Sequence, residues 1–352
     1  MQLFSPLIQR SLTLRNRIVV SPMCQYTVKD GTPGDWHLVH LGSRAVGGAA
    51  VVIAEATAVE PRGRISPADT GIWNDAQRDA WAPIARFIAA QGSIPGIQLA
   101  HAGRKGSTAA PWDGGKAVAP DAGGWTPVAP SALAYAGDYP QPEALDAAGI
   151  RAVTAAFVAA ARRAHDAGFR LIELHAAHGY LLHQFLSPLS NRRDDDYGGS
   201  LANRMRLTLE VAAAVRAAWP AELPLWLRLS ATDWAEGGWD LAQSIELVRE
   251  LERIGVDLVD VSSGGLTAAQ KINAGPGYQV SFAATIRRET SCAIGAVGLI
   301  SEPAQAETIL ASGQADVVIL ARELLRDPYF PRRAARELGA EIAPPRQYQR
   351  AW

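Results

Sequence analysis

Eight short runs of valine, isoleucine and leucine recur along the chain, and helical patterns separate most of them. The runs are apolar at nearly every position, which is typical of parallel strands that are covered on both faces. We expect strands at 17–20, 50–54, 96–100, 171–174, 224–229, 258–261, 293–296 and 316–320. We expect helices at 76–91, 149–167, 203–217, 241–254, 279–288 and 303–312, with a final helix near 329–338. Eight strand–helix units that close on themselves predict an α/β fold, the (β/α)8 TIM barrel.

The length of 352 residues is within the usual range for one such barrel. No polar or Pro/Gly-rich linker divides the chain near its middle, so we expect residues 1–352 to form a single barrel domain. The segment at about 102–142 is rich in Gly, Pro, Ser and Trp, and we interpret it as an elaborated loop. An open, doubly wound sheet is the alternative, weakened because no strand leads into a Gly-x-Gly-x-x-Gly turn.

Charge and cysteine content narrow the partners of the chain. The 34 basic and 35 acidic residues leave a net charge of −1, which argues against nucleic acid or an anionic membrane as the main partner. Cys24 and Cys292 are too few for a disulfide scaffold or an iron–sulfur cluster. No secretory signal and no run of about 18 apolar residues is visible. We therefore expect a cytoplasmic, soluble enzyme with a small-molecule substrate.

Polar residues and glycines gather where the predicted strands end, which is where a TIM barrel builds its active site. Ser21-Pro22-Met23-Cys24-Gln25-Tyr26 follows the first strand, and Glu55-Ala56-Thr57 follows the second. The later strands contribute Gln98 with His101-Ala-Gly-Arg104-Lys105, then His175-Ala-Ala-His178-Gly-Tyr180, then Arg228. This agreement across independent strands predicts the site better than any one motif does.

Small residues and an arginine end the last three strands. Gly264, Gly265, Gly298 and Ala321-Arg322 suit a phosphate site, because small residues let backbone N–H groups approach an anion. Arg322 would add a permanently charged, bidentate donor. In the alternative interpretation the glycines only make tight turns and Arg322 forms a surface ion pair.

His175 and His178, three residues apart just past a strand, have three interpretations: metal ligands, donors to a substrate oxygen, or structural groups. A zinc site needs a third protein ligand, which Glu55 or Asp233 could supply, so a metal-dependent barrel hydrolase is the alternative function. Tyr180 offers a neutral acid beside the two histidines, and donors paired with an acid suit carbonyl polarisation plus protonation. We assign His183, in an apolar context, to structure.

Several long motifs resemble the Old Yellow Enzyme family of flavin-dependent ene-reductases. They are residues 21–26, the segment Gln98-Leu-Ala-His101-Ala-Gly-Arg104-Lys105, residues 175–180, and Ser187-Pro-x-x-Asn191-x-Arg193-x-Asp195-x-Tyr197-Gly-Gly-Ser200-x-x-Asn203-Arg204. Cys24 and the C-terminal Gln347-Tyr-Gln-Arg-Ala-Trp352 are similar to the bacterial thermophilic-like, or xenobiotic reductase, subgroup.

The resemblance implies a noncovalent FMN at the mouth of the barrel. It places the flavin against Ser21, Pro22, Met23 and Cys24, the ring system against Ala56, Gln98 and Arg228, and the phosphate against Gly298, Ala321 and Arg322. Cys24 on its own suggests a small buried filler, whereas the resemblance implies that its thiol tunes the flavin. Cys292 keeps the filler interpretation. Ala321 departs from the family, which often has glycine there, and this puts close backbone approach to the phosphate in doubt.

The resemblance also implies a reaction: NADPH or NADH reduces FMN, and an activated alkene then takes the hydride at the same site. His175 and His178 would bind the carbonyl or nitro oxygen, and Tyr180 would protonate the α-carbon. Tyr26 and Lys105 would contact the substrate or nicotinamide, although Lys105 alone could equally be a surface charge. Arg350 and Trp352, on a C-terminal arm at about 340–352, are implied to act in trans within a homodimer or homotetramer.

Overall fold

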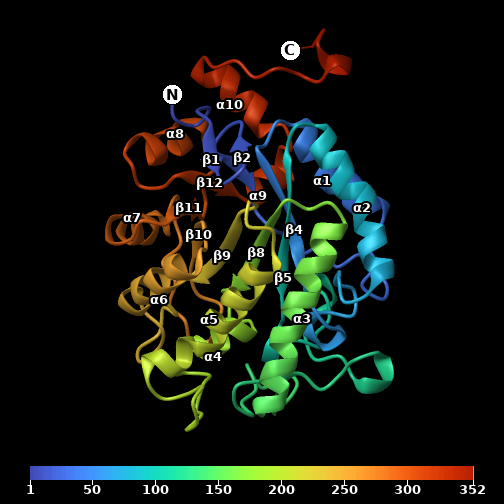
Figure 1. The fold of residues 1–352 in the computed structure, drawn as a ribbon, viewed down its shortest axis with the longest axis vertical. Helices are drawn as coiled ribbons and strands as arrows, with labels where there is room; N and C mark the ends of the chain where they lie inside the picture. The colour runs from blue at the N-terminus through green and yellow to red at the C-terminus, as the bar shows by residue number, and fades with distance from the viewer. Residues whose placement is uncertain (352) are drawn as a thin grey trace.

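The structure is a computed structural model that describes residues 1–351, and a closed parallel barrel lies at its centre (Figure 1). Its strands are hydrogen-bonded in the order β10-β11-β12-β3-β4-β5-β8-β9, and every neighbouring pair is parallel. The strands are β3 (Ile18–Val20), β4 (Val51–Ala58), β5 (Ile94–Ala100), β8 (Leu171–Ala176), β9 (Leu225–Ser230), β10 (Leu258–Ser262), β11 (Ala293–Val297) and β12 (Val317–Leu320). The predicted (β/α)8 barrel is confirmed, and the doubly wound alternative is wrong because the sheet closes.

Helices surround the barrel between successive strands (Figure 1). They are α1 (Asp35–Val46), α2 (Asp75–Ala90), α3 (Ala147–Asp166), α4 (Leu181–Leu186), α5 (Leu201–Ala218), α6 (Leu241–Ile254), α7 (Val280–Glu289), α8 (Pro303–Ala311), α9 (Arg322–Arg326) and α10 (Phe330–Leu338). The seven predicted helices match α2, α3, α5, α6, α7, α8 and α10 to within about two residues at each end. The sequence missed α1, whose buried face includes His37, His40 and Gly42 and so lacks a clear apolar stripe. It also missed α4 and α9, which are too short to show a period.

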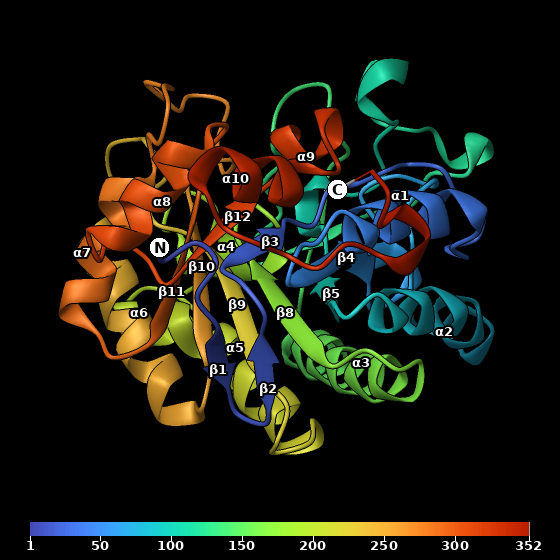
Figure 2. The ribbon, with the colours of Figure 1, turned by 90° about the horizontal axis from the view of Figure 1, so that it is seen from above.

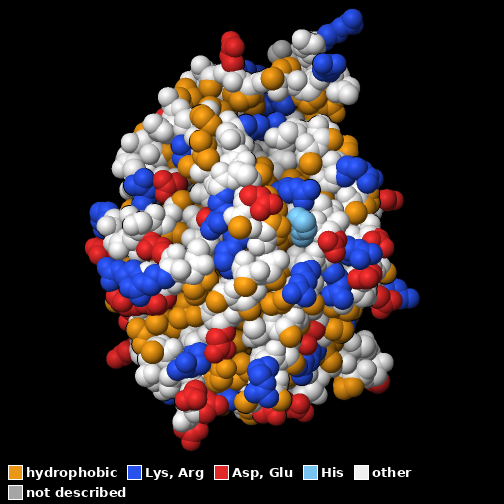
Figure 3. Space-filling view, viewed as in Figure 1, with side chains coloured by type: hydrophobic (Ala, Val, Ile, Leu, Met, Phe, Trp, Pro, Cys, Tyr) orange, Lys and Arg blue, Asp and Glu red, His pale blue; other side chains and the backbone are white. Residues whose placement is uncertain are grey.

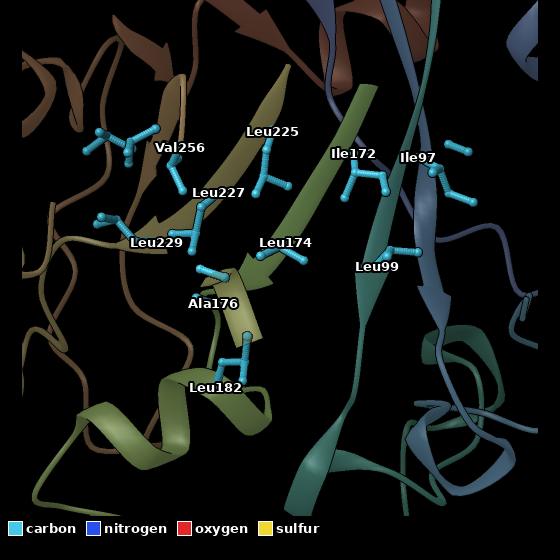
Figure 4. Packing of buried hydrophobic residues seen from close by; sticks show 14 of the residues in the cluster. Ile97, Leu99, Ile172, Leu174, Ala176, Leu182, Leu225, Leu227, Leu229 and Val256 are labelled. Carbon is cyan, nitrogen blue, oxygen red and sulfur yellow. The ribbon is translucent and has the colours of Figure 1, made fainter. Parts of the chain in front are cut away.

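Side chains alternate across the barrel wall, and this alternation positions the site. Figure 4 shows Ile97 and Leu99 of β5 beside Ile172 and Leu174 of β8, in the cluster that packs against the helices. Because successive strand residues point to opposite faces, the polar residue between each apolar pair points into the barrel. Gln98, Glu173, His175, Arg228 and Asp260 all occupy such inward positions and are buried.

A two-stranded hairpin closes the amino end of the barrel. It consists of β1 (Leu7–Gln9) and β2 (Leu12–Leu14), and Figure 2 shows it lying over that end of the strands. Trp226 Nε1 donates a hydrogen bond of 3.2 Å to Gln9 Oε1, and Leu14 joins the buried cluster around Trp226. A side-chain plug of this kind leaves the opposite, carboxyl end as the open face.

The segment at 102–142 contains short 3-10 turns and one strand, β6 (Val128–Ala129), which pairs with β7 (Glu143–Ala144). It lies near the α4 end of the barrel, whereas the C-terminal arm after α10 lies at the opposite end (Figure 1). Arg332 donates to the carbonyl oxygens of Val46 and Ala343, which holds the start of the arm beside the amino end of β4. Acidic and basic side chains are interspersed over the face in Figure 3. Within the described residues, no helix has the length and apolarity to cross a membrane.

Candidate active site

A cavity of about 230 Å³ opens at the carboxyl ends of β11 and β12, lined in part by Arg228, Gly298, Ala321 and Arg322. Gly298 has φ +120°, and a Cβ there would lie 2.7 Å from Gln279 Nε2, so only glycine fits. Arg322 is exposed and forms no ion pair with any residue in 1–351, so the surface-ion-pair interpretation is wrong. A free guanidinium and a glycine cradle fit a phosphate group, and the methyl group of Ala321 does not close the cavity.

Gly264 and Gly265 lie outside this cavity, although the sequence placed them with the phosphate residues. A Cβ on Gly265 would lie 2.5 Å from His178 Cα, and Gly264 O accepts a hydrogen bond from Ser230 Oγ. These glycines therefore allow close packing against the loop that carries His178.

Arg228 of β9 reaches from the wall of the barrel toward the end of β3. Its Nη1 donates to Ser21 Oγ at 3.1 Å, and its Nε lies 3.1 Å from Asp260 Oδ2. The Arg228–Asp260 ion pair lacks a well-aligned hydrogen bond, so charge attraction is what holds it. This brings Arg228 and Ser21, predicted on distant parts of the chain, to one point.

Two buried carboxyl groups were missed by sequence reasoning. Glu173 accepts a 2.7 Å hydrogen bond from Gln98 Nε2, and its other oxygen has no partner among the described residues. Burial raises the pKa of both Glu173 and Asp260, and Arg228 partly offsets the rise. A single acidic residue inside an otherwise apolar strand was the signal for each, since it must face the barrel interior.

His175, His178 and Tyr180 are brought together as predicted by their spacing. The ring of His175 lies 4.9 Å from that of Tyr180 and 5.2 Å from that of His178, measured between centroids. Burial lowers the pKa of both histidines well below the ordinary value, with Arg228 the next cause. Burial also raises the pKa of Tyr180 well above its ordinary value. At neutral pH the cluster therefore offers two uncharged imidazoles and one phenol that keeps its proton.

Hydrogen bonds set the proton positions on the two imidazoles. Ala177 N donates to His175 Nδ1 at 3.3 Å, so the His175 proton sits on Nε2 and is available as a donor. His178 Nε2 lies 2.7 Å from Ser262 Oγ. His178 can donate from Nδ1 only when the Ser262 hydroxyl donates to Nε2. The orientation of this hydroxyl therefore determines whether His178 can donate a hydrogen bond to a substrate.

Lys105 is anchored, not solvated. Its Nζ donates to His178 O at 2.9 Å and to Gly265 O at 3.0 Å, and it lies 5.1 Å from the ring centre of Tyr180. Burial lowers the pKa of Lys105 to about 8, and Arg104 adds to the effect. The surface-charge interpretation of Lys105 is therefore wrong, because its ammonium group ties the turn at His178 to the loop after β10.

The segment after β3 forms another wall. Pro22 is buried, and Met23, Cys24 and Tyr26 are half-buried. Burial raises the pKa of the Cys24 thiol, so it stays protonated, and it also raises the pKa of Tyr26. Ala56 is buried at an irregularity in the β4–β5 pairing, next to Gln98 in the register. Cys292 is buried beside β11 with its Sγ 3.6 Å from Val256 O, as expected of a filler.

A metal site at His175 and His178 would need Glu55 or Asp233 as its third ligand, and neither carboxylate is available. His183 Nε2 lies 2.8 Å from Asp233 Oδ1, and His37 Nε2 lies 2.7 Å from Glu55 Oε1, so both carboxylates are engaged elsewhere. No group of three His, Cys, Asp or Glu side chains within 1–351 has the arrangement of a metal site. His183 is a buried structural group, in agreement with its apolar context.

Arg350 is exposed on the arm at the amino end of the barrel, so the structure does not bring it to the site of its own chain. Tyr348 on the same arm lies near Tyr329, with ring centroids 6.5 Å apart. Trp352 lies outside the described residues.

Residues 2–341 match the model of a family described as the NADH:flavin oxidoreductase / NADH oxidase family, whose model is that of FMN-dependent oxidoreductases. The barrel, the cavity at the carboxyl ends of β11 and β12, and this match together define the class of the protein. It is a TIM-barrel enzyme that binds FMN and takes electrons from a reduced nicotinamide.

Individual relatives agree with this class. A protein named NADPH dehydrogenase from Geobacillus sp. (strain WCH70) is 47% identical over 352 residues, covering 99% of this chain and 98% of that protein. A structure of morphinone reductase in complex with tetrahydroNAD matches with a TM-score of 0.80 and 30% identity, covering 99% and 93% of the two chains. The old yellow enzyme homologue from Zymomonas mobilis matches with a TM-score of 0.79 and 27% identity over 98% and 94%. The chain belongs to the NADH:flavin oxidoreductase / NADH oxidase family, and the predicted Old Yellow Enzyme resemblance is confirmed.

Proposed function

We propose that this oxidoreductase uses NADPH, or NADH, to reduce the C=C bond of activated alkenes. The substrate classes are α,β-unsaturated carbonyl compounds and maleimides, with nitro compounds and nitrate esters as further candidates. The observation that carries the proposal is the pairing of the neutral His175 donor with the protonated Tyr180, whose rings lie 4.9 Å apart. Donation to an oxygen beside a proton source is what reduction of a polarised C=C bond requires.

Bound FMN would supply hydride transfer in two half-reactions, a ping-pong sequence in which nicotinamide and alkene use the site in turn. Ser21, Pro22, Met23, Cys24, Ala56, Gln98 and Arg228 would hold its ring system, and Gly298, Ala321 and Arg322 its phosphate. The free guanidinium of Arg322 and the glycine-only position at 298 support this assignment.

The side chains of the chain itself polarise and protonate the substrate. His175 Nε2–H donates to the carbonyl or nitro oxygen, and His178 joins it when Ser262 donates to its Nε2. Tyr180 transfers its phenolic proton to the α-carbon. Lys105 fixes the backbone of His178, and Tyr26 and Lys105 border the substrate, while the thiol of Cys24 tunes the ring system.

We assign the arm at 340–352 to a neighbouring subunit's site, in a cytoplasmic homodimer or homotetramer. The exposure of Arg350 and its distance from its own barrel mouth support this assignment (Figure 1). Mixed oligomers of Arg350→Ala and Tyr180→Phe chains should regain part of the activity that each lacks alone. Mixtures with no regained activity would contradict exchange of the arm.

Purified protein should be yellow and should bleach when NADPH is added anaerobically. It should then regain its colour with an enone, a maleimide or a nitro compound, and the rates across such a panel identify the substrate class. A protein that bleaches but is reoxidised by none of them would refute the proposed reaction while leaving its family intact.

Tyr180→Phe should slow reoxidation by an enone by about a hundredfold or more, because general-acid catalysis contributes that much. Bleaching by NADPH should stay within about twofold, since no proton is transferred in that step. Stopped-flow absorbance measures both half-reactions. Equal losses in both would mean that Tyr180 is not simply the proton donor.

A further inference from the structure

Asp69 is a buried carboxyl group that no part of the proposed reaction uses. It is 1% exposed and lies on the turn between β4 and α2. Its Oδ2 accepts backbone hydrogen bonds from Ile65 N at 2.7 Å and from Ser66 N at 3.2 Å. Its Oδ1 has no hydrogen-bond partner within residues 1–351. A buried polar atom without a partner is unusual enough to require an explanation.

A small cavity lies between Asp69 and Tyr180. Both residues line it, and the rest of its wall is Gly63, Ile65 and four alanines, so these two carry its only polar side chains. The centre of a water molecule has about 10 Å³ available there, which is close to the space that one water needs. A water in a buried site also needs polar partners, and Asp69 and Tyr180 can supply them.

The charge environment places a proton on Asp69. Burial, and next to it the charge of Glu55, raise the pKa of Asp69 to about 8, although the backbone N–H groups of Ile65 and Ser66 and the charge of Arg64 lower it in part. At pH 7 the group is therefore a carboxylic acid. Because Oδ2 already accepts two N–H groups, the acidic hydrogen belongs on Oδ1, the oxygen that has no partner among the described residues. Cys24, Tyr26 and Tyr180 are the other titratable groups that feel the charge of Asp69.

We propose that Asp69 and one water molecule in this cavity form the chain that returns a proton to the Tyr180 phenol. The proposal rests on the proposed role of Tyr180 as proton donor. As Tyr180 gives its proton to the α-carbon, its O–H bond breaks and the proton is replaced in the same step. The water donates a proton to that oxygen and takes the proton of Asp69, which becomes a carboxylate and regains a proton from solvent. One solvent proton is consumed in each turnover, and no group in the chain is oxidised or reduced.

The direction of transfer follows from the two acidities. The pKa of Tyr180 is raised well above its ordinary value by burial, whereas that of Asp69 is about 8, so the proton moves from Asp69 toward the Tyr180 oxygen. A merely structural Asp69 would need only Oδ2, which caps the turn through Ile65 and Ser66. A structural role would therefore use Oδ2, whereas the proton relay would use Oδ1.

Asp69→Asn distinguishes them, because the amide oxygen can still accept from Ile65 and Ser66 but the side chain holds no acidic proton. Reduction by NADPH should stay within about twofold, and reoxidation by an enone should slow by about tenfold. The solvent isotope effect on reoxidation, measured in H₂O–D₂O mixtures, should indicate more than one moving proton in the parent enzyme and one in Asp69→Asn. Tyr180→Phe serves as the reference for complete loss of the donor.

Infrared spectra of the flavin-free protein provide a readout that does not depend on activity. At pH 7 the parent protein should show the carbonyl stretch of a buried protonated carboxyl group, and the part of this band that Asp69 contributes should vanish in Asp69→Asn. Spectra without such a difference, or Asp69→Asn reoxidation within twofold of the parent at the same isotope effect, would overturn the relay. If Tyr180→Phe itself leaves reoxidation unchanged, the proposed function of Tyr180 fails instead.

Discussion

Replacing Asp233 by asparagine should destabilise the fold by about 3 kcal/mol, although the side chain keeps its shape. Asp233 is fully buried and accepts from His183 Nε2 at 2.8 Å, Ser187 Oγ at 2.6 Å and Trp239 N at 2.7 Å. These partners hold the pKa of Asp233 below its ordinary value despite burial, so the pocket favours the charge and a neutral amide must lose stability.

The magnitude follows from the donors and acceptors. The amide oxygen of asparagine can keep Ser187 and Trp239, but its NH₂ group then faces His183 Nε2. His183 Nδ1 must stay unprotonated, because Gly179 N donates to it at 2.9 Å. If His183 keeps its proton on Nε2 two donors oppose each other, and if it moves the proton to Nδ1 the Gly179 bond is lost. One buried bond is lost in either case, at about 1–3 kcal/mol, and two charge-assisted bonds weaken.

Thermal unfolding measures the effect. At about 2.1 cal/mol/K per residue, the unfolding entropy of 352 residues is about 0.7 kcal/mol/K, so 3 kcal/mol lowers the Tm by about 4 °C. Asp79→Asn is the matched control, since that carboxylate is 68% exposed and should change the Tm by less than about 1 °C. If the Asp233→Asn protein has the same Tm as the Asp79→Asn control, the argument is refuted. Equal Tm values would mean that His183 and Gly179 keep their hydrogen bonds without the carboxylate.

Three further predictions concern stability and cofactor binding. Burial lowers the pKa of His40 to about 3 while the unfolded imidazole titrates near 6.5, so stability is lost as pH falls below about 6.5; by pH 5 the loss is about 2 kcal/mol, and His40→Phe should remove that part of the difference between melts at pH 7 and pH 5. Gly265→Ala should cost at least about 1 kcal/mol more than Gly199→Ala, because both have positive φ but only a Cβ at 265 meets His178 Cα, at 2.5 Å; equal melts would count against the contact. Arg322→Gln should weaken FMN binding at least about tenfold, as measured by fluorescence titration of the flavin-free protein, and an unchanged Kd would place the phosphate elsewhere.

The barrel was predictable because its strands repeat one strong pattern, a short run of apolar residues. The orientation of each side chain then follows from the alternation of successive strand residues between the two faces. Gln98 lies between Ile97 and Leu99, so once β5 is placed in a barrel the amide must point inward. The same alternation assigns Arg228 to the interior from Leu227 and Leu229. The sequence therefore predicted the set of residues at the barrel mouth better than it predicted their partners.

Partners were harder to predict because they depend on register between strands far apart in the chain. Asp260 faces Arg228 only because β9 and β10 pair residue 228 with residue 260, and no local spacing encodes that pairing. Asp69 was harder still. It lies in an irregular turn of the kind that usually carries solvated aspartates, and only the folded structure buries it.

The small net charge of −1 conceals a strong local charge balance at the site. Arg228 is neutralised in part by Asp260, whereas Arg322 has no acidic partner in the described chain. A phosphate dianion is attracted mainly by unpaired cations, so in the proposed FMN complex Arg322 would attract the phosphate more strongly than Arg228 would. Arg228 is fixed between Ser21 and Asp260, and in the proposed complex its guanidinium would be positioned where negative charge develops during reduction. The sequence expected Arg228 at the ring system and Arg322 at the phosphate, and the pairing of one arginine and not the other among the described residues supports that division.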